Sequence, residues 1–368
     1  MRKIIATLSI ASILLTACGN EQNTVSNQKS QVTSTTEKET NTTNNAAEIP
    51  AAVNKKLKIA LVMEFSIGTF SSQYIDGVKR QVEKFGGEVQ VYNADNDLAK
   101  MAANLDTAVN AKVDGILIDH GRKETLEKGV KKALEEGIPV VSFDSDLNLP
   151  GVTVIDQDDY SLAWKSLKSL AEDLNGKGKI ATIWVGGFTP MDRRKVMIEA
   201  FYKRYPGIKE VARFGKASSN TMLDTQSQVE ALLKKYPKGE LDAIFATWDE
   251  FAKGATKAIQ QAGRNEIKVY GIDLSDEDLQ LIQQPDSPWV ASAASDPGEI
   301  GEVQSRFLYQ KIAGEETPDI YSLEPKLIEK EDLPSNPIKV SDLSKYSKNW
   351  TPTSAATSPW MEQFEKGK

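Results

Sequence analysis

KIALVM, at residues 58–63, carries five apolar residues in succession. A run of this kind favours a parallel strand that is buried on both faces. The segment YIDGVKRQVEKFGG at 74–87 predicts a helix whose apolar face carries Tyr74, Val78, Val82 and Phe85. The Gly-Gly pair that closes this segment ends the helix, and EVQVY at 88–92 predicts a second strand. The order strand, helix, strand is that of a right-handed βαβ unit with parallel strands.

The same alternation continues along the chain in two series. The first series of predicted strands is Ile59–Met63, Glu88–Tyr92, Gly115–Ile118, Pro139–Phe143 and Val152–Ile155. The second series is Ile180–Val185, Glu210–Phe214, Ala243–Ala246, Lys268–Ile272 and Trp289–Ala293. Amphipathic windows separate them, such as the one that carries Leu98, Met101, Leu105 and Val109. The sequence therefore predicts an α/β fold with two doubly wound parallel-sheet lobes.

Composition and motifs narrow the classes of function. The chain has 45 basic and 52 acidic residues, a net charge of −7, which argues against nucleic-acid binding. It has one Cys and one His, so neither an intrachain disulfide nor a His-rich metal site is expected. No G-x-G-x-x-G follows a strand, and neither G-x-x-x-x-G-K-[ST] nor G-x-S-x-G occurs. We expect no metal, no cofactor and no enzymatic activity.

The N-terminus holds the single cysteine, Cys18. Arg2 and Lys3 precede an apolar stretch that is too short to span a bilayer but suits a secretory signal. Its end, LTACG at residues 15–19, resembles the lipobox of bacterial lipoproteins. The resemblance implies that residues 1–17 are removed and that Cys18 carries acyl chains that anchor the protein. The alternative is a plain signal peptide with a chance cysteine.

Residues 18–55 predict a disordered polar tether behind that anchor, because residues 20–48 are almost entirely polar and cannot bury enough apolar surface to fold. The expected location is extracytoplasmic, at the bacterial cell membrane.

Ligands of open α/β sheets bind outside the carboxyl ends of the strands. The predicted strand ends carry carboxylates, guanidinium groups and aromatic rings, namely Asp144, Asp146, Arg193, Arg194, Trp248, Asp249, Glu250 and Asp273, with Phe70 nearby. Carboxylates accept bonds from hydroxyls, arginine donates to paired oxygens, and aromatic faces cover the C–H surface of a sugar ring. This combination suits a neutral, polyhydroxylated ligand.

Each of these residues also has a structural interpretation. In this interpretation Asp144 and Asp249 act as helix N-caps without contacting a ligand, and Trp248 belongs to the core. Arg194 can be solvated, and only one of Arg193 and Arg194 is expected to face the cleft, because successive helical residues diverge by about 100°.

Four blocks in order resemble the ribose/galactose class of periplasmic binding proteins over about residues 56–334. They are KIALVM with Phe70 and YIDG, GIPVVSFD at 137–144, AIFATWDE at 243–250, and VYGID at 269–273. The same body occurs in lactose-repressor-type regulators, but those begin with a helix-turn-helix, which this chain lacks. The chain is thus similar to the solute-binding component of sugar ABC importers.

The resemblance implies particular contacts. Phe70 would stack on the sugar, and Asp144 and Asp273 would accept hydroxyl bonds from the two lobes. One arginine would span two oxygens, with Arg193, Arg194 and Lys195 as the candidates. His120 either donates one bond to the ligand or is a structural residue. Other family contacts are replaced here, at Gly68, Ser71, Ser145, Trp248 and Ser295, so neither ribose nor galactose is assumed.

The resemblance also implies a domain arrangement, with three crossovers forming a hinge. Lobe one would hold residues 56–155 and 296–323, lobe two residues 156–295 and 324–340, and residues 341–368 would form a C-terminal tail. Closure of the hinge on a small sugar or polyol would present the protein, as a monomer, to ABC permease subunits.

Two other functions remain. A sensory receptor module could use the same cleft and pass the closed form to a kinase or chemoreceptor. A hydrolase based on Asp249 and Glu250 is disfavoured, because adjacent side chains diverge and make a poor acid–base pair across a bond.

Overall fold

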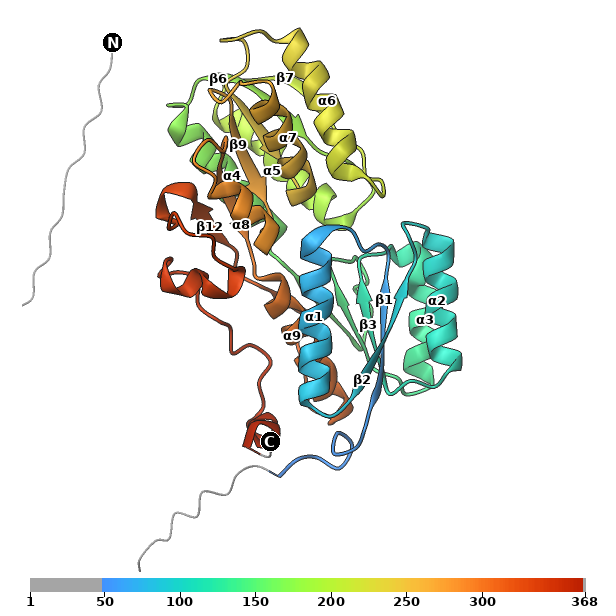
Figure 1. The fold of residues 1–368 in the computed structure, drawn as a ribbon. Coiled ribbons are helices and arrows are strands. Elements are labelled where there is room, and N and C mark those ends of the chain that lie inside the picture. The colour runs from blue at the N-terminus through green and yellow to red at the C-terminus, as the bar shows by residue number, and fades with distance from the viewer. Residues whose placement is uncertain (1–47, 367–368) are drawn as a thin grey trace, which may run out of the picture. The chain divides into compact units, whose positions relative to one another are not determined.

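The computed structural model describes residues 48–366 of the chain (Figure 1). The predicted signal peptide, Cys18 and most of the predicted tether lie outside the described residues. Where the tether was predicted to end, the structure differs: Val53 is fully buried in the core of the first lobe, so the folded body begins before residue 56. Within the described part of the chain, no helix is long and apolar enough to cross a membrane.

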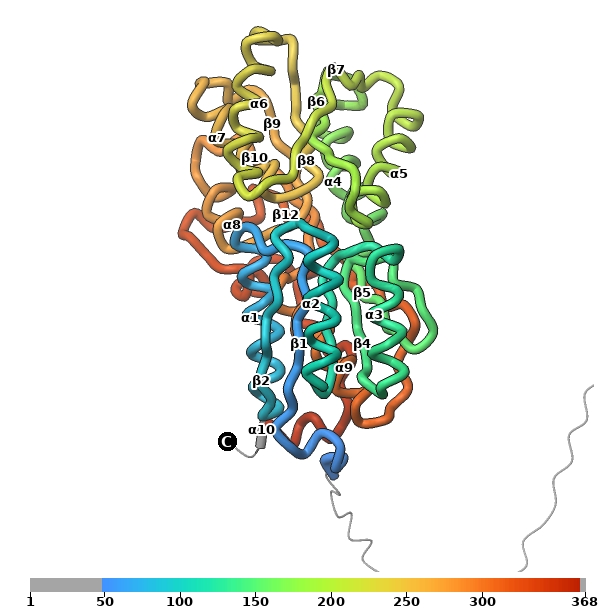
Figure 2. The backbone as a smooth tube through the Cα atoms, turned by 90° about the vertical axis from the view of Figure 1, so that its right-hand side faces the viewer, coloured from blue at the N-terminus to red at the C-terminus, as the bar shows by residue number. Residues whose placement is uncertain are grey.

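Lobe one is built on a parallel six-stranded sheet in the order β11-β5-β4-β3-β1-β2. Its strands are β1 (Lys58–Met63), β2 (Glu88–Asn93), β3 (Gly115–Asp119), β4 (Val140–Phe143), β5 (Val152–Asp156) and β11 (Ile320–Ser322). One face packs against α1 (Gly68–Lys84) and α9 (Pro297–Ile312), and the other against α2 (Leu98–Asn110) and α3 (Lys123–Glu135) (Figure 2).

Alternation along β1 explains this layering. Ile59 and Leu61 belong to the core under α1 and α9, whereas Ala60 and Val62 belong to the core under α2 and α3. Successive strand residues point to opposite faces, so a run that is apolar throughout must be covered on both sides. The predicted apolar face of α1 is confirmed, because Tyr74, Val78 and Val82 are all buried.

Lobe two repeats the design with the sheet order β12-β10-β9-β8-β6-β7. Its strands are β6 (Gly178–Ile183), β7 (Ile208–Phe214), β8 (Ala243–Ala246), β9 (Lys268–Ile272), β10 (Trp289–Ala294) and β12 (Lys326–Glu329), of which β12 runs antiparallel to β10. Its helices are α4 (Asp159–Asp173), α5 (Thr189–Arg204), α6 (Thr221–Lys235), α7 (Asp249–Gln261) and α8 (Asp276–Ile282). The predicted fold class, two doubly wound α/β lobes, is confirmed.

The chain passes between the lobes at three places: from β5 to α4, from β10 to α9, and from β11 to β12. Each passage is short, so the lobes are joined by three adjacent connections that can act as a hinge. The carboxyl ends of the parallel strands in both lobes face the space that these connections close off.

The C-terminal tail, whose placement the sequence leaves open, packs against both lobes. Leu343 in the 3₁₀ helix η2 (Val340–Lys345) and the indole of Trp350 lie in the core of lobe two. Trp360 in η3 (Pro359–Glu362) lies in the core of lobe one, followed by the short α10 (Gln363–Lys366). The tail therefore makes a fourth connection between the lobes.

Candidate ligand-binding cleft

A cavity lies between the two lobes at the strand ends. It is lined from lobe one by Phe65, Ile67, Phe70, Ser71, Tyr74, Asn96, Asp119, His120, Phe143 and Asp144. The crossover residue Gln157 and lobe two complete it with Val185, Phe188, Pro190, Met191, Arg194, Ala217, Ser218, Trp248 and Asp273. Of the predicted site residues, the cavity brings together Phe70, His120, Asp144, Arg194, Trp248 and Asp273.

Three of these residues follow strands directly and have left-handed backbone conformations. The φ angles are 61° at His120, after β3, 49° at Asp144, after β4, and 71° at Asp273, after β9. Their amide groups still extend the sheets, as in the bond from Asp144 N to the Ile155 carbonyl at 2.9 Å. Such a conformation costs about 1–2 kcal/mol in a non-glycine residue. Strain of this kind clusters at functional sites, where it aims a side chain out of the sheet.

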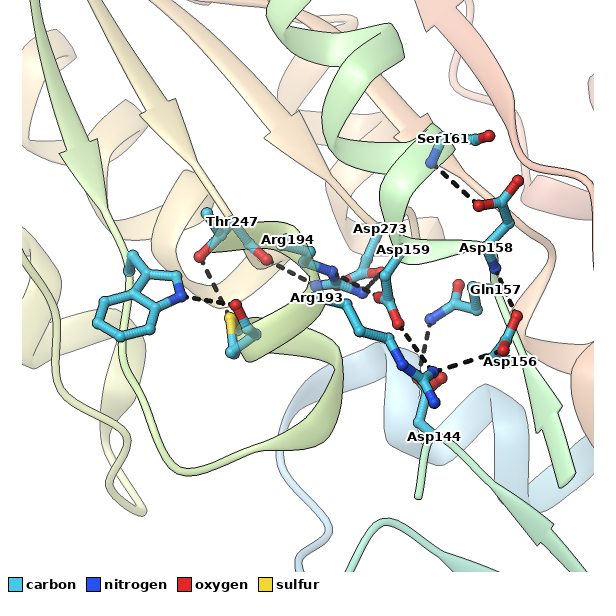
Figure 3. Close-up of polar contacts among 12 residues, drawn as sticks. Asp144, Asp156, Gln157, Asp158, Asp159, Ser161, Arg193, Arg194, Thr247 and Asp273 are labelled. Atoms are coloured by element: carbon cyan, nitrogen blue, oxygen red, sulfur yellow. Dashed lines mark hydrogen bonds and ion pairs between the residues drawn. The ribbon is translucent and has the colours of Figure 1, made fainter. Parts of the chain in front are cut away.

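Arg194 is the arginine that lines the cavity, and Figure 3 shows its contacts with Asp159, Thr247 and Asp273. Its guanidinium donates to Asp159 Oδ1 at 2.9 Å, to the Thr247 carbonyl at 2.6 Å, and to the two Asp273 oxygens at 3.3 and 3.4 Å. Burial alone would lower the pKa of Arg194, but the charges of Asp273 and Asp159 outweigh it and raise the pKa. Four of its five N–H groups are thereby used, so one remains for a ligand oxygen.

Asp144 offers a free acceptor from lobe one. Its Oδ2 accepts a bond from Gln157 Nε2 at 3.3 Å, while Oδ1 is buried and has no hydrogen-bond partner within residues 48–366. Burial, reinforced by the negative charge of Asp159, raises the pKa of Asp144 well above its usual value. A buried polar atom without a partner is costly, so this oxygen points to a ligand that supplies the missing bond.

His120 joins the polar and aromatic parts of the cavity. Its Nδ1 lies 2.8 Å from Asp119 Oδ1, and its ring centroid is 4.8 Å from that of Phe65. Burial opposes the charged form of the imidazole, but the charges of Asp119, Asp144 and Glu64 outweigh that effect and raise the pKa of His120 to about 9. At neutral pH this side chain is therefore a cationic hydrogen-bond donor.

The structure places three candidates elsewhere. Asp249, predicted to bind the ligand, does not line the cavity: as the first residue of α7 it turns inward, and its Oδ2 lies 3.5 Å from the buried Lys253 ammonium. Arg193 bonds to the Ser145 carbonyl at 3.3 Å and to Asp159 at 3.4 Å, and it does not line the cavity. Lys195 is exposed and pairs with Glu199. The prediction for Asp249 is corrected because a helix start sets the direction of its side chain, which the strand-end position alone does not.

Tyr74 and Phe143 line the cavity but were not among the predicted site residues, and the same is true of two further aromatic residues, Phe65 and Phe188. Both lie in segments that follow strands, after β1 and β6 respectively, and β6 ends at Ile183 rather than at the predicted Val185. The signal that could have identified them is the simple presence of an aromatic residue within a few positions of a strand end. Among residues 48–366, no group of His, Cys, Asp and Glu side chains is arranged to hold a metal ion.

Direct contacts join the two lobes outside the cavity lining. Thr69 Oγ1 donates to Glu277 Oε2 at 3.0 Å, and Arg122 of lobe one donates to the Gly187 carbonyl of lobe two at 2.9 Å. The guanidinium of Arg122 also pairs with Asp192 at 3.0 Å. The structure therefore describes the closed arrangement of the two lobes.

Sequence comparison relates this chain to solute receptors. Residues 59–316 match the model of the periplasmic binding protein domain. The ribose import binding protein of Escherichia coli is 24% identical over 286 residues, covering 78% of this chain and 95% of that protein. A xylitol-binding protein of Mycolicibacterium smegmatis is 25% identical over 239 residues, covering 64% of this chain and 67% of that protein.

Solved structures agree with this relationship. A sugar ABC transporter protein from Yersinia enterocolitica is 39% identical with a TM-score of 0.84, covering 87% of this chain and 98% of that one. A 5-methylthioribose transporter solute-binding protein from Thermotoga lettingae, solved with 5-methylthioribose, is 35% identical with a TM-score of 0.83, covering 87% and 100%. Members of this family bind and deliver solutes outside the cytoplasm and are not enzymes. With its two hinged lobes and interlobe cavity, the chain belongs to the periplasmic binding protein family.

Proposed function

We propose that this protein binds a monosaccharide or a similar small polyol between its lobes and delivers it to an ABC importer. The observation that carries the proposal is the buried, unpartnered Oδ1 of Asp144, a residue that lines the cavity together with Arg194. Relatives named for ribose and xylitol support a ligand of this class.

The geometry suggests how binding is coupled to closure. Asp144 and His120 belong to lobe one, and Arg194 and Asp273 belong to lobe two. A ligand that bonds to both sets favours the closed arrangement over the open one by the contacts that only closure completes. The closed outer surface is then what a permease recognises.

Calorimetry and thermal unfolding of the chain from residue 19 onward test the binding step. The panel holds ribose, xylitol, apiose, allitol, glucose and 5-methylthioribose. A ligand at 100 times its Kd should stabilise the folded state by about 2.7 kcal/mol, because it binds the folded state alone. If no member of the panel raises the unfolding midpoint or releases heat, the proposed sugar-binding function is wrong.

We further propose that Cys18 carries the lipid anchor that holds the receptor at the cell membrane. The support is the lipobox-like LTACG at residues 15–19. Cells that express the full chain are labelled with an alkyne-bearing fatty acid, and Cys18→Ser is the matched control. The label should appear on the wild-type chain and be absent from the variant; equal labelling of both would contradict the assignment.

A further inference from the structure

The cavity lining divides into two chemically different halves. The first half holds the carboxylates, amide and guanidinium of Asp144, Gln157, Arg194 and Asp273, which bond to one another across the hinge side of the cleft. The second half, the aromatic half, is defined by Phe65, Phe188 and Trp248.

The aromatic half is assembled by both lobes. The ring centroid of Phe65, from lobe one, lies 5.5 Å from that of Phe188 and 5.8 Å from that of Trp248, both from lobe two. The ring planes meet at 81° and 60°, so the rings stand at an angle to one another and do not stack in parallel. Rings in this arrangement form adjoining walls of an apolar corner, which differs from the parallel faces that would sandwich a flat sugar ring.

Two hydroxyl groups of the cavity lining are already engaged. The Ser218 hydroxyl donates to Asp224 at 2.7 Å, and the Tyr74 hydroxyl donates to Gln304 at 2.5 Å. Lobe two also contributes the apolar residues Val185, Pro190 and Ala217 to the cavity lining. A ligand hydroxyl placed against the faces of these rings would lose its bonds to water without gaining a partner there, whereas an apolar group would be favoured.

From this division we infer that the ligand is a sugar that keeps its hydroxyls at one end and carries an apolar substituent, such as an alkyl or thioether group, at the other. The inference rests on the proposed sugar-binding function and deepens it. The hydroxyls face Asp144 and Arg194, and the substituent fills the corner between Phe65, Phe188 and Trp248. His120 stands at the junction, with its ring against Phe65 and its Nδ1 bonded to Asp119.

Matched sugars test the inference by calorimetry. Ribose, 5-deoxyribose and 5-methylthioribose share the hydroxyls at C1, C2 and C3 and differ at C5, and 5-deoxyribose controls for the ring form because, like 5-methylthioribose, it cannot form a six-membered ring. 5-Methylthioribose, which adds an apolar group to 5-deoxyribose, should bind about 10- to 200-fold more tightly than 5-deoxyribose, the range for a methylene in a hydrophobic pocket. Xylose and glucose, each beside its methyl glycoside, extend the comparison to a substituent at C1.

Two variants assign the effect to its place in the cleft. Phe188→Ala should reduce the difference in affinity between 5-methylthioribose and 5-deoxyribose, because it removes one wall of the apolar corner. Asp144→Asn should reduce the affinity for both sugars by the same factor, because Asp144 is expected to contact hydroxyls that both sugars carry. Thermal unfolding without ligand establishes that both variants fold.

The outcomes separate the inference from the function on which it rests. If the unsubstituted sugar binds as tightly as its substituted partner in every pair, the inference is overturned and the sugar-binding function stands. If the gap is unchanged in Phe188→Ala, the apolar corner is not the subsite and the inference is likewise overturned. If no sugar of any pair binds, the proposed function itself has failed.

Discussion

Asp144 combines three features that are unfavourable in the ligand-free protein. It has a strained backbone, a buried carboxylate, and one oxygen without a partner among residues 48–366. Each of these features lowers the stability of the ligand-free protein. A residue that is unfavourable for folding and placed in a cavity is expected to gain its compensation from binding.

Asp144→Asn should therefore have opposite effects on binding and on stability. Asparagine tolerates the left-handed backbone but lacks the carboxylate, so sugar affinity should fall about 10- to 100-fold, the value of a lost charge-assisted bond. The ligand-free variant should be at least as stable as wild type at pH 7, because a buried ionisable group is gone. Calorimetry gives the affinity, and urea unfolding gives the stability.

The pH dependence of stability provides the control for Asp144→Asn. Because burial raises the pKa of Asp144, the folded chain holds this proton more tightly than the unfolded chain does. Wild type thus loses stability as pH rises above the ordinary value of about 3.9, and the advantage of the variant should shrink toward pH 4. A variant that is less stable than wild type at pH 7 would contradict this assignment.

At the scale of single residues, the sequence predicts well which residues lie near the cleft. It predicts less well the direction in which their side chains point. Asp144, Asp273 and Trp248 follow strands, and strand ends converge, so their presence in the cavity could be predicted. The choice between Arg193 and Arg194 depends on the rotation of α5, and the inward turn of Asp249 depends on the start of α7. Both are set by packing between helix and sheet, which no local pattern encodes.

At the scale of elements, long apolar runs determined what could be predicted. Most strands of the two series were found because they are buried runs between amphipathic helices, whereas β2 and β7 are only partly buried. Two strands were missed, β11 and β12, with three and four residues. They are shorter than the predicted edge strands β2 and β7, which have six and seven residues, and they are only partly buried, so their sequences carry no strong apolar signal.

The N-terminus of α1 carries an interlobe contact outside the cavity. Gly68 has a φ of +74°, and a Cβ added there would lie 2.1 Å from Glu250 Oε1 of lobe two. Glu250 forms an ion pair with Lys253, which is almost fully buried, and Lys253 also bonds to Glu277 at 3.2 Å. Opening of the cleft separates Gly68 from this cluster, so any group added at Gly68 disfavours the closed arrangement alone.

Gly68→Ala should therefore weaken ligand binding about tenfold or more, because closure would displace Glu250 from Lys253. Gly86→Ala is the matched control: its φ is +79°, but an added Cβ meets nothing within 4 Å. Both variants should lose similar stability without ligand, since both place alanine in a left-handed conformation. Equal ligand affinities in the two variants would show that the Gly68 contact does not affect closure.

At the scale of the whole described body, the tail limits how the two lobes separate. Trp350 is held in the core of lobe two, while three residues later the Thr353 amide donates to Glu299 of α9 in lobe one at 2.9 Å. The Thr353 carbonyl accepts a bond from Arg306, also on α9, at 3.4 Å. Three residues span at most about 10 Å when extended, so we expect this link to hold the two lobes close together where it crosses between them.

Lengthening the chain between Trp350 and Thr353 should change how the cleft opens, while the contacts of both residues with their lobes stay in place. An insertion of Gly-Ser-Gly-Ser between Thr351 and Pro352 keeps Trp350 and Thr353 in place but lengthens the connection. The ligand-free protein should then show a larger radius of gyration by small-angle scattering, and the bound sugar should dissociate several-fold faster, because the open arrangement is favoured. The unfolding free energy should change by less than about 1 kcal/mol, since loop closure depends only weakly on length.

The same four residues inserted between Lys238 and Gly239 serve as the control, because this turn joins α6 to β8 within lobe two and an added Cβ at Gly239 meets nothing within 4 Å. That insertion should leave both the radius of gyration and the dissociation rate as in wild type. If the two insertions behave alike, the fourth connection places no limit on the hinge, and the tail contributes only its packing against each lobe, which includes the burial of Leu343, Trp350 and Trp360.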